Sequence, residues 1–150
     1  MGYALVVAFV LVSSLAQAGR TQVQRQDNIL GKQLFEGLVM VPAKMSGHSV
    51  ALPAEASRCS NCHANASAMR STDVALGQTR AFATPLNQTT LNTVFARRGG
   101  PASRYDSLSF CKVVREGIDP RQVVINSAMP RYPLSDAQCA AIWSYVMSYS

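Results

Sequence analysis

The sequence predicts a single all-α domain, and three observations lead to that expectation. The 150 residues are a usual length for one domain, and 48% apolar with only 15% charged residues excludes a disordered chain. Apolar residues recur at helical spacing in segments that begin at capping residues and stop at glycine or proline. We find no two segments with the alternation and connecting turn that predict a strand pair.

The first residues have the pattern of an export signal. An apolar run from Tyr3 to Leu15 is followed by an Ala-Gln-Ala triplet at 16–18, which matches a cleavage site. The run is shorter than the roughly 18 residues that span a bilayer, and an uncleaved anchor is the alternative. We therefore expect a cleaved signal peptide over residues 1–18, a domain over residues 19–150, and a periplasmic or otherwise exported protein without a stable membrane span.

The first expected helix covers residues 28–38, where leucines recur every four residues. Gly31 lies inside it and costs about 1 kcal/mol of helix stability relative to alanine. A long loop is expected over residues 40–58, because two prolines and a glycine interrupt that stretch.

Three further helices are expected in the second half of the chain. The segment 89–98 is stopped by a Gly-Gly-Pro run, and the segment 105–116 ends at a glycine. The last helix, over residues 135–148, opens with a capping box of Ser135 and Gln138. One face of it consists of Cys139, Ile142, Trp143 and Val146.

The most informative motif is Cys59-Ser60-Asn61-Cys62-His63, which has the C-x-x-C-H spacing of covalent haem attachment. Two thiols three positions apart can form thioethers with the two vinyl groups of one haem, and the histidine that follows supplies a nitrogen ligand to the iron. Covalent attachment also retains the cofactor outside the cell. We therefore expect one covalent haem c, held by Cys59, Cys62 and His63.

Three other interpretations explain less of this motif. A thioredoxin-like C-x-x-C would lie near a βαβ pattern, and no strand run precedes Cys59. A zinc site would need a second pair of ligands at finger-like spacing, but the other histidine, His48, and the two remaining cysteines are isolated. A disulfide between Cys59 and Cys62 would leave His63 unexplained.

A second axial ligand is expected from Met129, which is followed by Pro130 and, three residues later, by Pro133. The two prolines stiffen the segment, which suits holding a weak thioether ligand at a fixed distance. Methionine paired with histidine is an established axial set of such haems. Ordinary core packing of Met129 is the alternative. The other candidate ligands are His48, Met40, Met45, Met69 and Met147.

Taken together, these features resemble class I monohaem c-type cytochromes of the exported bacterial type, over nearly all of the expected mature chain. The family has an N-terminal helix with a glycine and an aromatic residue, and then C-x-x-C-H, Pro-Leu, Met-Pro and a closing helix with aromatic residues. The matching residues outside the haem motif are Gly31, Phe35, Pro85-Leu86, Met129-Pro130, Trp143 and Tyr145.

The resemblance implies a cytochrome c fold, with about four helices around the haem. In this family the glycine matched by Gly31 allows close approach of the last helix. The proline matched by Pro85 typically accepts, through its carbonyl, a hydrogen bond from the axial histidine, here His63. The long stretch from Leu38 to Arg58 and the extra pair of cysteines depart from the family pattern and leave the subfamily open.

A haem with both axial positions filled has no open site for a substrate, so we expect an electron carrier and not an enzyme. The protein would act as a free carrier or as the cytochrome subunit of a dehydrogenase. Electrons would arrive from an upstream dehydrogenase and pass to an oxidase or another cytochrome. The net charge of +6 suits acidic docking faces on redox partners, and no motif points to nucleic acid.

Two other functional classes remain open. One is a haem enzyme or ligand-binding haem protein whose iron is open or bound by a cysteine thiolate, from Cys111 or Cys139. The other is an interaction module in which the haem is only structural. Ready binding of carbon monoxide, without the weak far-red band of methionine-ligated ferric iron, would favour the open site.

Several residues outside the motif are further candidates. Cys111 and Cys139 are expected to form a disulfide, because two cysteines remain after haem attachment in an oxidising compartment; two buried free thiols are the alternative. Asn126 and Tyr132 flank Met129 and are candidates for hydrogen bonds near it. Partners for the haem propionates are sought among four arginines: Arg97, Arg98, Arg104 and Arg131.

Overall fold

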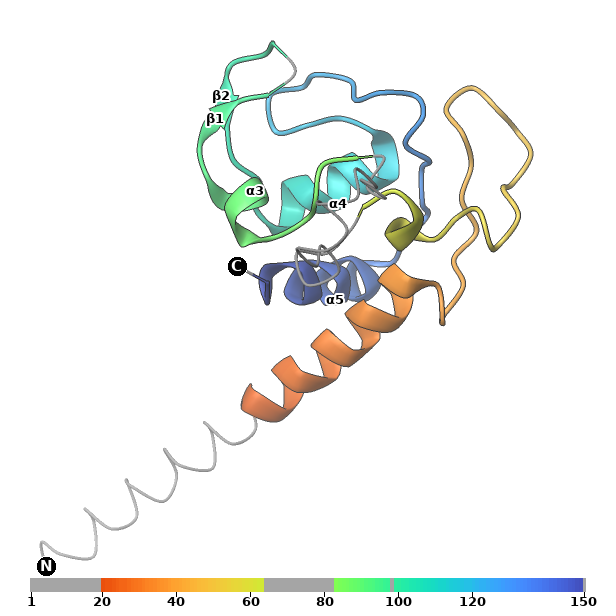
Figure 1. Cartoon of the computed structure of the whole chain (residues 1–150), viewed down its shortest axis with the longest axis vertical. Helices are drawn as coiled ribbons and strands as arrows, with labels where there is room; N and C mark the ends of the chain where they lie inside the picture. Colours follow the sequence, from red (N-terminus) through yellow and green to blue (C-terminus); the bar gives the residue numbers. More distant parts are fainter. Residues whose placement is uncertain (1–19, 64–82, 98, 150) are drawn as a thin grey trace, which may run out of the picture.

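The computed structural model describes residues 20–63, 83–97 and 99–149, and Figure 1 shows their arrangement. The expected signal peptide, residues 1–18, lies outside the described residues. A helix over residues 20–36 comes first along the described chain. The labelled elements that follow are η1 (Cys59–Asn61), α3 (Gln88–Asn92), β1 (Phe95–Ala96), β2 (Ala102–Ser103), α4 (Ser107–Glu116) and α5 (Asp136–Met147).

Helix 20–36 packs against α5 at Gly31. A Cβ atom added to Gly31 would lie 2.0 Å from the carbonyl oxygen of Ala141 and 2.7 Å from the Cβ of Tyr145, so a side chain here would push the helices apart. One turn further on, the ring of Phe35 packs against the ring of Tyr145, with centroids 5.6 Å apart. The expected close approach of the last helix at Gly31 is confirmed.

The extent of this helix differs from the expected 28–38. Helical structure already covers the polar residues from position 20, whose side chains are exposed as far as Gln26. The helix stops before Gly37, which has a φ of +74° in the left-handed region that favours glycine. Leu38, which was expected to continue the apolar stripe, therefore lies beyond the helix and is 71% exposed.

Helices α4 and α5 both begin at a reciprocal capping box. The Asp106 carboxylate accepts from the Ser109 backbone N–H while the Ser109 hydroxyl bonds back to the Asp106 backbone, and Ser135 and Gln138 do the same for α5. The predicted capping box at Ser135 is confirmed. Helix α4 begins two residues after the expected position 105 because Asp106 is its cap, and it ends at the predicted Gly117, with a φ of +76°.

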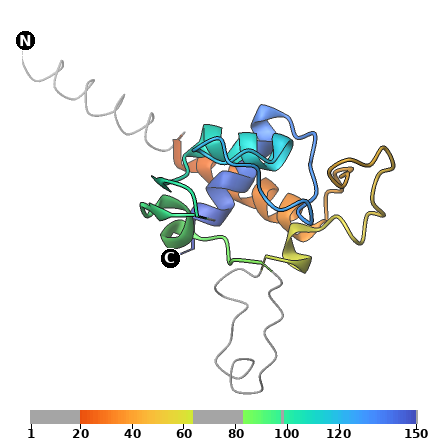
Figure 2. The same cartoon turned by 90° about the horizontal axis from the view of Figure 1, so that it is seen from above.

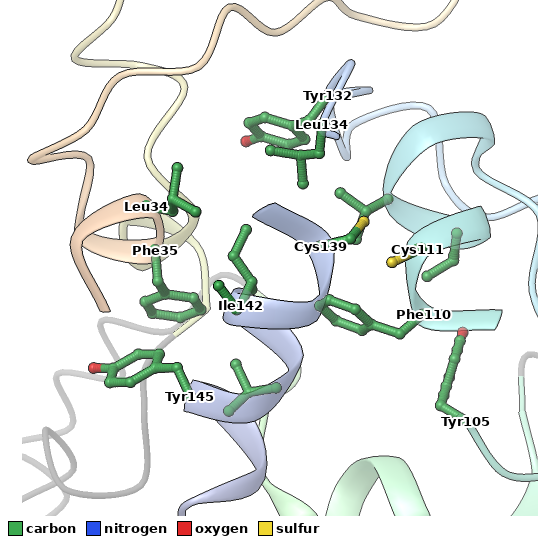
Figure 3. Close-up of a cluster of buried hydrophobic side chains, with 14 of the residues drawn as sticks. Leu34, Phe35, Tyr105, Phe110, Cys111, Tyr132, Leu134, Cys139, Ile142 and Tyr145 are labelled. Carbon is green, nitrogen blue, oxygen red and sulfur yellow. The ribbon is translucent and has the colours of Figure 1, made fainter. Parts of the chain in front are cut away.

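The core lies where α4 and α5 pack against each other and against helix 20–36, and Figure 3 shows part of it. The rings of Phe110 on α4 and Trp143 on α5 lie 5.4 Å apart between centroids. Its largest apolar members include Leu34, Phe35, Tyr105, Phe110, Val113, Val114, Tyr132, Leu134, Ile142, Tyr145 and Val146.

The cysteines of α4 and α5 meet in this core. Figure 3 shows the sulfurs of Cys111 and Cys139 directed toward each other. Cys139 is fully buried and Cys111 is 9% exposed. Both are free thiols, so the expected disulfide is not present in this structure, which instead has the two buried thiols of the alternative.

The expected helix 89–98 is wrong in its second half. Helix α3 ends at Asn92, and the chain then extends into β1, which pairs antiparallel with β2 so that Phe95 faces Ser103. The β-branched and aromatic residues at 93–95 favour extended backbone over helix. The expectation that the chain has no strand pair is therefore also wrong, and the Gly-Gly-Pro run lies between the two strands.

Arg97 explains why this hairpin folds back on α3. Its guanidinium donates to the carbonyl oxygens of Leu91 (3.3 Å) and Thr93 (3.0 Å), which are carbonyls at the end of α3. It also lies 3.8 Å above the centre of the Phe95 ring. Arg97 is 9% exposed, so its guanidinium is held inside the fold.

The predicted 40–58 loop is confirmed, and it lies to one side of the helices in both Figure 1 and Figure 2. Lys44 pairs with Ala51 inside the loop and with Arg131 of a distant segment. The Lys44 backbone N–H donates to the Arg131 carbonyl (3.0 Å), and the Arg131 N–H donates to the Lys44 carbonyl (2.8 Å). The loop that leads into η1 is thereby joined to the segment that carries Met129.

Candidate cofactor-attachment site

The 3-10 turn η1 brings the motif cysteines and His63 together. The backbone N–H groups of Cys62 and His63 both donate to the Cys59 carbonyl, at 3.2 and 2.8 Å. In a 3-10 turn, residues three apart lie on the same side, which suits the attachment of both thiols to one planar group. From outside, the Asn61 side chain donates to the Glu55 carbonyl (2.6 Å) and fastens the turn to the 40–58 loop.

The ring of His63 is oriented by a distant carbonyl. Its Nδ1 lies 2.8 Å from the carbonyl oxygen of Thr84. Because a carbonyl oxygen can only accept, Nδ1 carries the proton and Nε2 keeps its lone pair. Burial lowers the pKa of His63 below its ordinary value, against a smaller opposite effect of the Thr84 hydrogen bond. The neutral ring with a free Nε2 is the form that binds a metal ion.

The expected acceptor for this histidine is wrong by one residue. The Thr84 carbonyl accepts from His63, whereas the Pro85 carbonyl accepts from the Thr90 hydroxyl at 2.7 Å. Thr90 also forms the capping box of α3 with Asn87. The start of α3 therefore fixes the segment that reaches the His63 ring.

Cys59 lies beside the buried hydroxyl of Tyr132. The Tyr132 hydroxyl donates to the Ser57 carbonyl at 2.8 Å. Desolvation raises the pKa of the Cys59 thiol to about 11, so the thiol is protonated at neutral pH. Desolvation, together with Cys59 and Cys62, also raises the pKa of Tyr132 above its ordinary value.

Met129 lies in a turn shaped by Asn126. The Met129 N–H donates to the Asn126 carbonyl (3.1 Å), and the Asn126 side-chain oxygen accepts from the Ala128 N–H (2.8 Å). The Met129 side chain is partly buried and packs against the core. Two residues were expected to form hydrogen bonds near Met129. Asn126 bonds to the backbone of the turn that contains Met129, and Tyr132 bonds to Ser57, two residues before the C-x-x-C-H motif.

The turn between α4 and the Met129 segment depends on a buried carboxylate. Asp119 is 1% exposed, and its Oδ1 accepts from the backbone N–H groups of Arg121 and Val123, each at 2.8 Å. An aspartate that bonds to backbone two and four residues on is a common way to close a turn. Asp119 was not predicted, although the Asp119-Pro120 pair after Gly117 is a turn signal.

The other candidate ligands lie in less suitable places. His48 and Met40 are exposed in or beside the 40–58 loop, and the Met40 side chain is 68% exposed. Met45 lies in the same loop, and Met147 packs against the core at the end of α5. Met69 lies outside the described residues.

Among the four candidate arginines, Arg131 lies next to Met129. Its Nη1 donates to the Met129 carbonyl, and its guanidinium lies against Gly117, where an added Cβ would be 2.2 Å from Cζ. Burial lowers the pKa of Arg131, and its Nη2 is buried without a hydrogen-bond partner in the described structure. Arg104 is exposed, and Arg98 lies outside the described residues.

A cavity of about 20 Å³ adjoins Cys59. That volume holds about one water molecule and is far smaller than a porphyrin. Whether the site suits a haem is therefore judged from the chemistry of Cys59, Cys62 and His63. Two thiols on one turn and a neutral imidazole nitrogen are the groups that hold a c-type haem, and the residues fit. The cavity is lined by Leu34, Gly37, Val39, Met40, Val41, Ala54, Ser57, Cys59, Val114, Tyr132, Leu134 and Ile142.

The described residues contain neither a candidate site for a bare metal ion nor a candidate membrane-spanning helix. Within residues 20–63, 83–97 and 99–149, no cluster of three or more His, Cys, Asp or Glu side chains could hold a bare metal ion. In the same ranges, no helix has both the length and the apolarity to cross a bilayer. Comparison with known proteins finds no matching family model, no matching curated protein and no matching solved structure.

Proposed function

We propose that this protein is an exported monohaem c-type cytochrome that carries one electron. Cys59 and Cys62 would hold the haem through thioether bonds, and His63 and Met129 would be the axial ligands of its iron. The protein would serve as a free carrier or as the cytochrome subunit of a dehydrogenase, and not as an enzyme itself.

The observation that carries this proposal is the hydrogen bond between His63 Nδ1 and the Thr84 carbonyl at the end of the C-x-x-C-H turn. Histidines that bind metals generally donate their other ring N–H to a carbonyl or carboxylate, which fixes the tautomer and the ring orientation. A disulfide or thioredoxin-like use of the two cysteines would not require an oriented neutral imidazole beside them. The hydrogen bond therefore favours haem attachment over those interpretations.

The packing of the helices supports the same proposal. In the family that the sequence resembles, a glycine in the first helix allows the last helix to approach closely. Here Gly31 meets the backbone of α5 at Ala141, and Phe35 packs on Tyr145 beside it. This is support from one pair of helices, and it is independent of the cysteine motif.

Bound at this site, a haem would supply a reversible one-electron couple between ferric and ferrous iron. The residues around it have separate tasks. His63 is kept neutral by burial and oriented by Thr84, while Arg131 holds the carbonyl of Met129. Apolar side chains such as Ile142 line the cavity that adjoins Cys59.

The cysteine-ligated alternative gains no support from the core. Burial raises the pKa of Cys139 to about 12, with a further contribution from the neighbouring Cys111. At neutral pH Cys139 is therefore a thiol and not the thiolate that would bind iron. Neither Cys111 nor Cys139 lines the cavity at Cys59.

The charge of the chain suits acidic redox partners. The sequence has 14 Lys and Arg residues against 8 Asp and Glu, a net charge of +6. An upstream dehydrogenase would donate the electron, and an oxidase or another cytochrome would accept it. Electrostatic steering of such encounters raises the association rate and weakens as salt is added.

Covalent attachment is tested by exporting the protein to the periplasm of a host that attaches haem c. Acid–acetone should leave the colour on the wild-type chain, and mass spectrometry should find one haem per chain. The variant Cys59→Ala with Cys62→Ala should lose all colour, whereas Cys111→Ala with Cys139→Ala should keep it. A wild-type chain that gives up its haem to acid–acetone would refute the attachment.

The sixth ligand is tested by Met129→Ala, with Met40→Ala as its control because Met40 is 68% exposed. Loss of the Met129 thioether should open the iron to carbon monoxide and lower the reduction potential, because a thioether favours ferrous iron. Met40→Ala should change neither property. An unchanged spectrum and potential in Met129→Ala would place the ligand elsewhere.

A further inference from the structure

Tyr132 connects two segments of the candidate site that are far apart in the sequence. It lies three residues after Met129 and is 7% exposed. Its hydroxyl donates at 2.8 Å to the carbonyl of Ser57, which lies two residues before Cys59 and is also 7% exposed. The Cys59 thiol lies near the same hydroxyl, as the mutual effect of the two groups on their pKa values indicates. In Figure 3 the Tyr132 ring lies with Leu134 beyond the first turn of α5.

The backbone of Tyr132 is held without help from Ser57. The Tyr132 N–H donates to the Val114 carbonyl of α4 at 3.1 Å, and the Leu134 N–H donates to the Tyr132 carbonyl at 2.9 Å. The preceding residue, Arg131, is paired with Lys44 through both of its backbone groups. The ring therefore extends from a fixed backbone position.

The segment around Ser57, whose carbonyl accepts the Tyr132 hydrogen bond, is also held by local hydrogen bonds. The Ser57 N–H donates to the carbonyls of Pro53 and Ala54, each at 3.2 Å, and the Ser57 hydroxyl donates to the Ala54 carbonyl at 2.9 Å. Two residues on, η1 begins at Cys59. The Tyr132 hydroxyl thus joins two locally fixed pieces of chain next to η1, in addition to the backbone pairing of Arg131 with Lys44 further along the loop.

We propose that Tyr132 is a positioning residue that sets the separation between the Cys59–His63 turn and the Met129 turn. This inference rests on the proposed function where it concerns the iron: by holding the two turns together, Tyr132 keeps Met129 within reach of a haem attached at Cys59 and Cys62. The link between the turns exists in the chain itself and can be measured with or without haem.

Removal of the hydroxyl alone separates this role from packing. Tyr132→Phe keeps the ring that fills the core but leaves the buried Ser57 carbonyl without its donor, which carries a desolvation cost. If Tyr132 only packs, the phenylalanine variant should behave as the wild type does. If Tyr132 positions the turns, both turns should become more mobile while the rest of the core stays unchanged.

The first measurement is backbone amide exchange in the full chain, with and without haem. Tyr132→Phe should exchange roughly tenfold faster at Asn61, Cys62 and His63, because local opening no longer breaks the Tyr132 hydrogen bond. The matched control is Tyr105→Phe, which removes a hydroxyl from a 6% exposed tyrosine away from the motif. Equal exchange rates at residues 61–63 in wild type and Tyr132→Phe would overturn the inference.

The second measurement uses the haem-loaded protein. Tyr132→Phe should bind carbon monoxide to ferrous iron roughly tenfold faster than the wild type, because the Met129 turn moves away more often. Tyr105→Phe should match the wild type. Equal carbon monoxide rates with faster amide exchange would show that the link exists but does not act on the iron, which would refute the second half of the inference.

A third measurement uses the wild-type protein, so it does not depend on whether a variant folds. In wild-type protein, the Tyr132 hydroxyl proton should exchange slowly with water and show magnetisation transfer to residues near Ser57. A hydroxyl proton in fast exchange would overturn the inference. A wild-type chain without covalent haem would refute the proposed function instead, and the amide and hydroxyl exchange experiments would still decide whether Tyr132 links the two turns.

Discussion

Replacing Gly31 by alanine tests the contact between two helices that supports the proposed family resemblance. The new methyl group would lie 2.0 Å from the Ala141 carbonyl oxygen and 2.7 Å from the Tyr145 Cβ. Carbon atoms in good contact are about 3.5 Å apart, so the second distance is about 0.8 Å too short. Neither atom belongs to the flexible end of a side chain, so neither can rotate away. Helix 20–36 and α5 must therefore separate by roughly 1 Å.

The size of the effect is the difference between two opposing contributions. Overpacking of a core by one methyl group costs about 1–3 kcal/mol, and a clash with backbone belongs at the upper end, about 3 kcal/mol. Alanine is better than glycine inside a helix by about 1 kcal/mol. The net loss in the free energy of unfolding should be about 2 kcal/mol. For a domain of roughly 130 residues, this lowers Tm by about 7 °C.

Unfolding in urea is the assay for this variant, followed by far-ultraviolet circular dichroism and by the fluorescence of Trp143, the single tryptophan. The control is Gln26→Ala, a change at an exposed position of the same helix, which should stay within about 0.5 kcal/mol of wild type. A Gly31→Ala protein as stable as the control would refute the contact between the helices, and a more stable one would show that only helix propensity acts at this position.

Two further predictions concern α4. Asp106→Ala should destabilise the protein by about 1 kcal/mol because α4 loses its cap, and Asp106→Asn should lose much less. Hydrogen bonds from Ser109 lower the pKa of Asp106, so its stabilising effect is present above the ordinary pKa of about 4 and is lost as the pH falls through the lower folded value. Urea unfolding from pH 6 to pH 2.5 should show this loss in wild type, and Asp106→Asn should lack that part of it. Cys111 and Cys139 are buried free thiols, so both should be alkylated in denaturant without reductant while neither reacts in the native protein; a pair that resists alkylation in denaturant would refute the free thiols.

Local signals in the sequence predicted two helix ends, the start of α5 and the end of α4. The capping box of Ser135 and Gln138 begins α5, and Gly117 ends α4, because these residues act through their own backbone and near neighbours. The loop over 40–58 was predicted for the same reason. The close approach at Gly31 came from the family resemblance, since spacing alone would have assigned that glycine only a cost.

Contacts between distant residues were not predictable in this way. Nothing in a single sequence indicates that Arg97 binds the carbonyls at the end of α3, the contact that folds the hairpin back on that helix. Thr84 was missed as the partner of His63 because the family pattern points to the following proline. Tyr132 was expected to act near Met129, but its partner, Ser57, is 75 positions away in the chain.

The pairing of Lys44 with Ala51 changes what the long loop costs the protein. A free connection of about 21 residues would lose more entropy on closure than one of about six, by about 1 kcal/mol. The pairing of Lys44 with Ala51 closes the loop, and the pairing of Lys44 with Arg131 fixes its base. The closed part then contains the six residues 45–50. The 40–58 loop therefore behaves as a short hairpin that is paired with the backbone of Arg131. Its outer residues, including Val50 at 78% exposure, are a place where a peptide tag or a photoactive label can be added without touching the core.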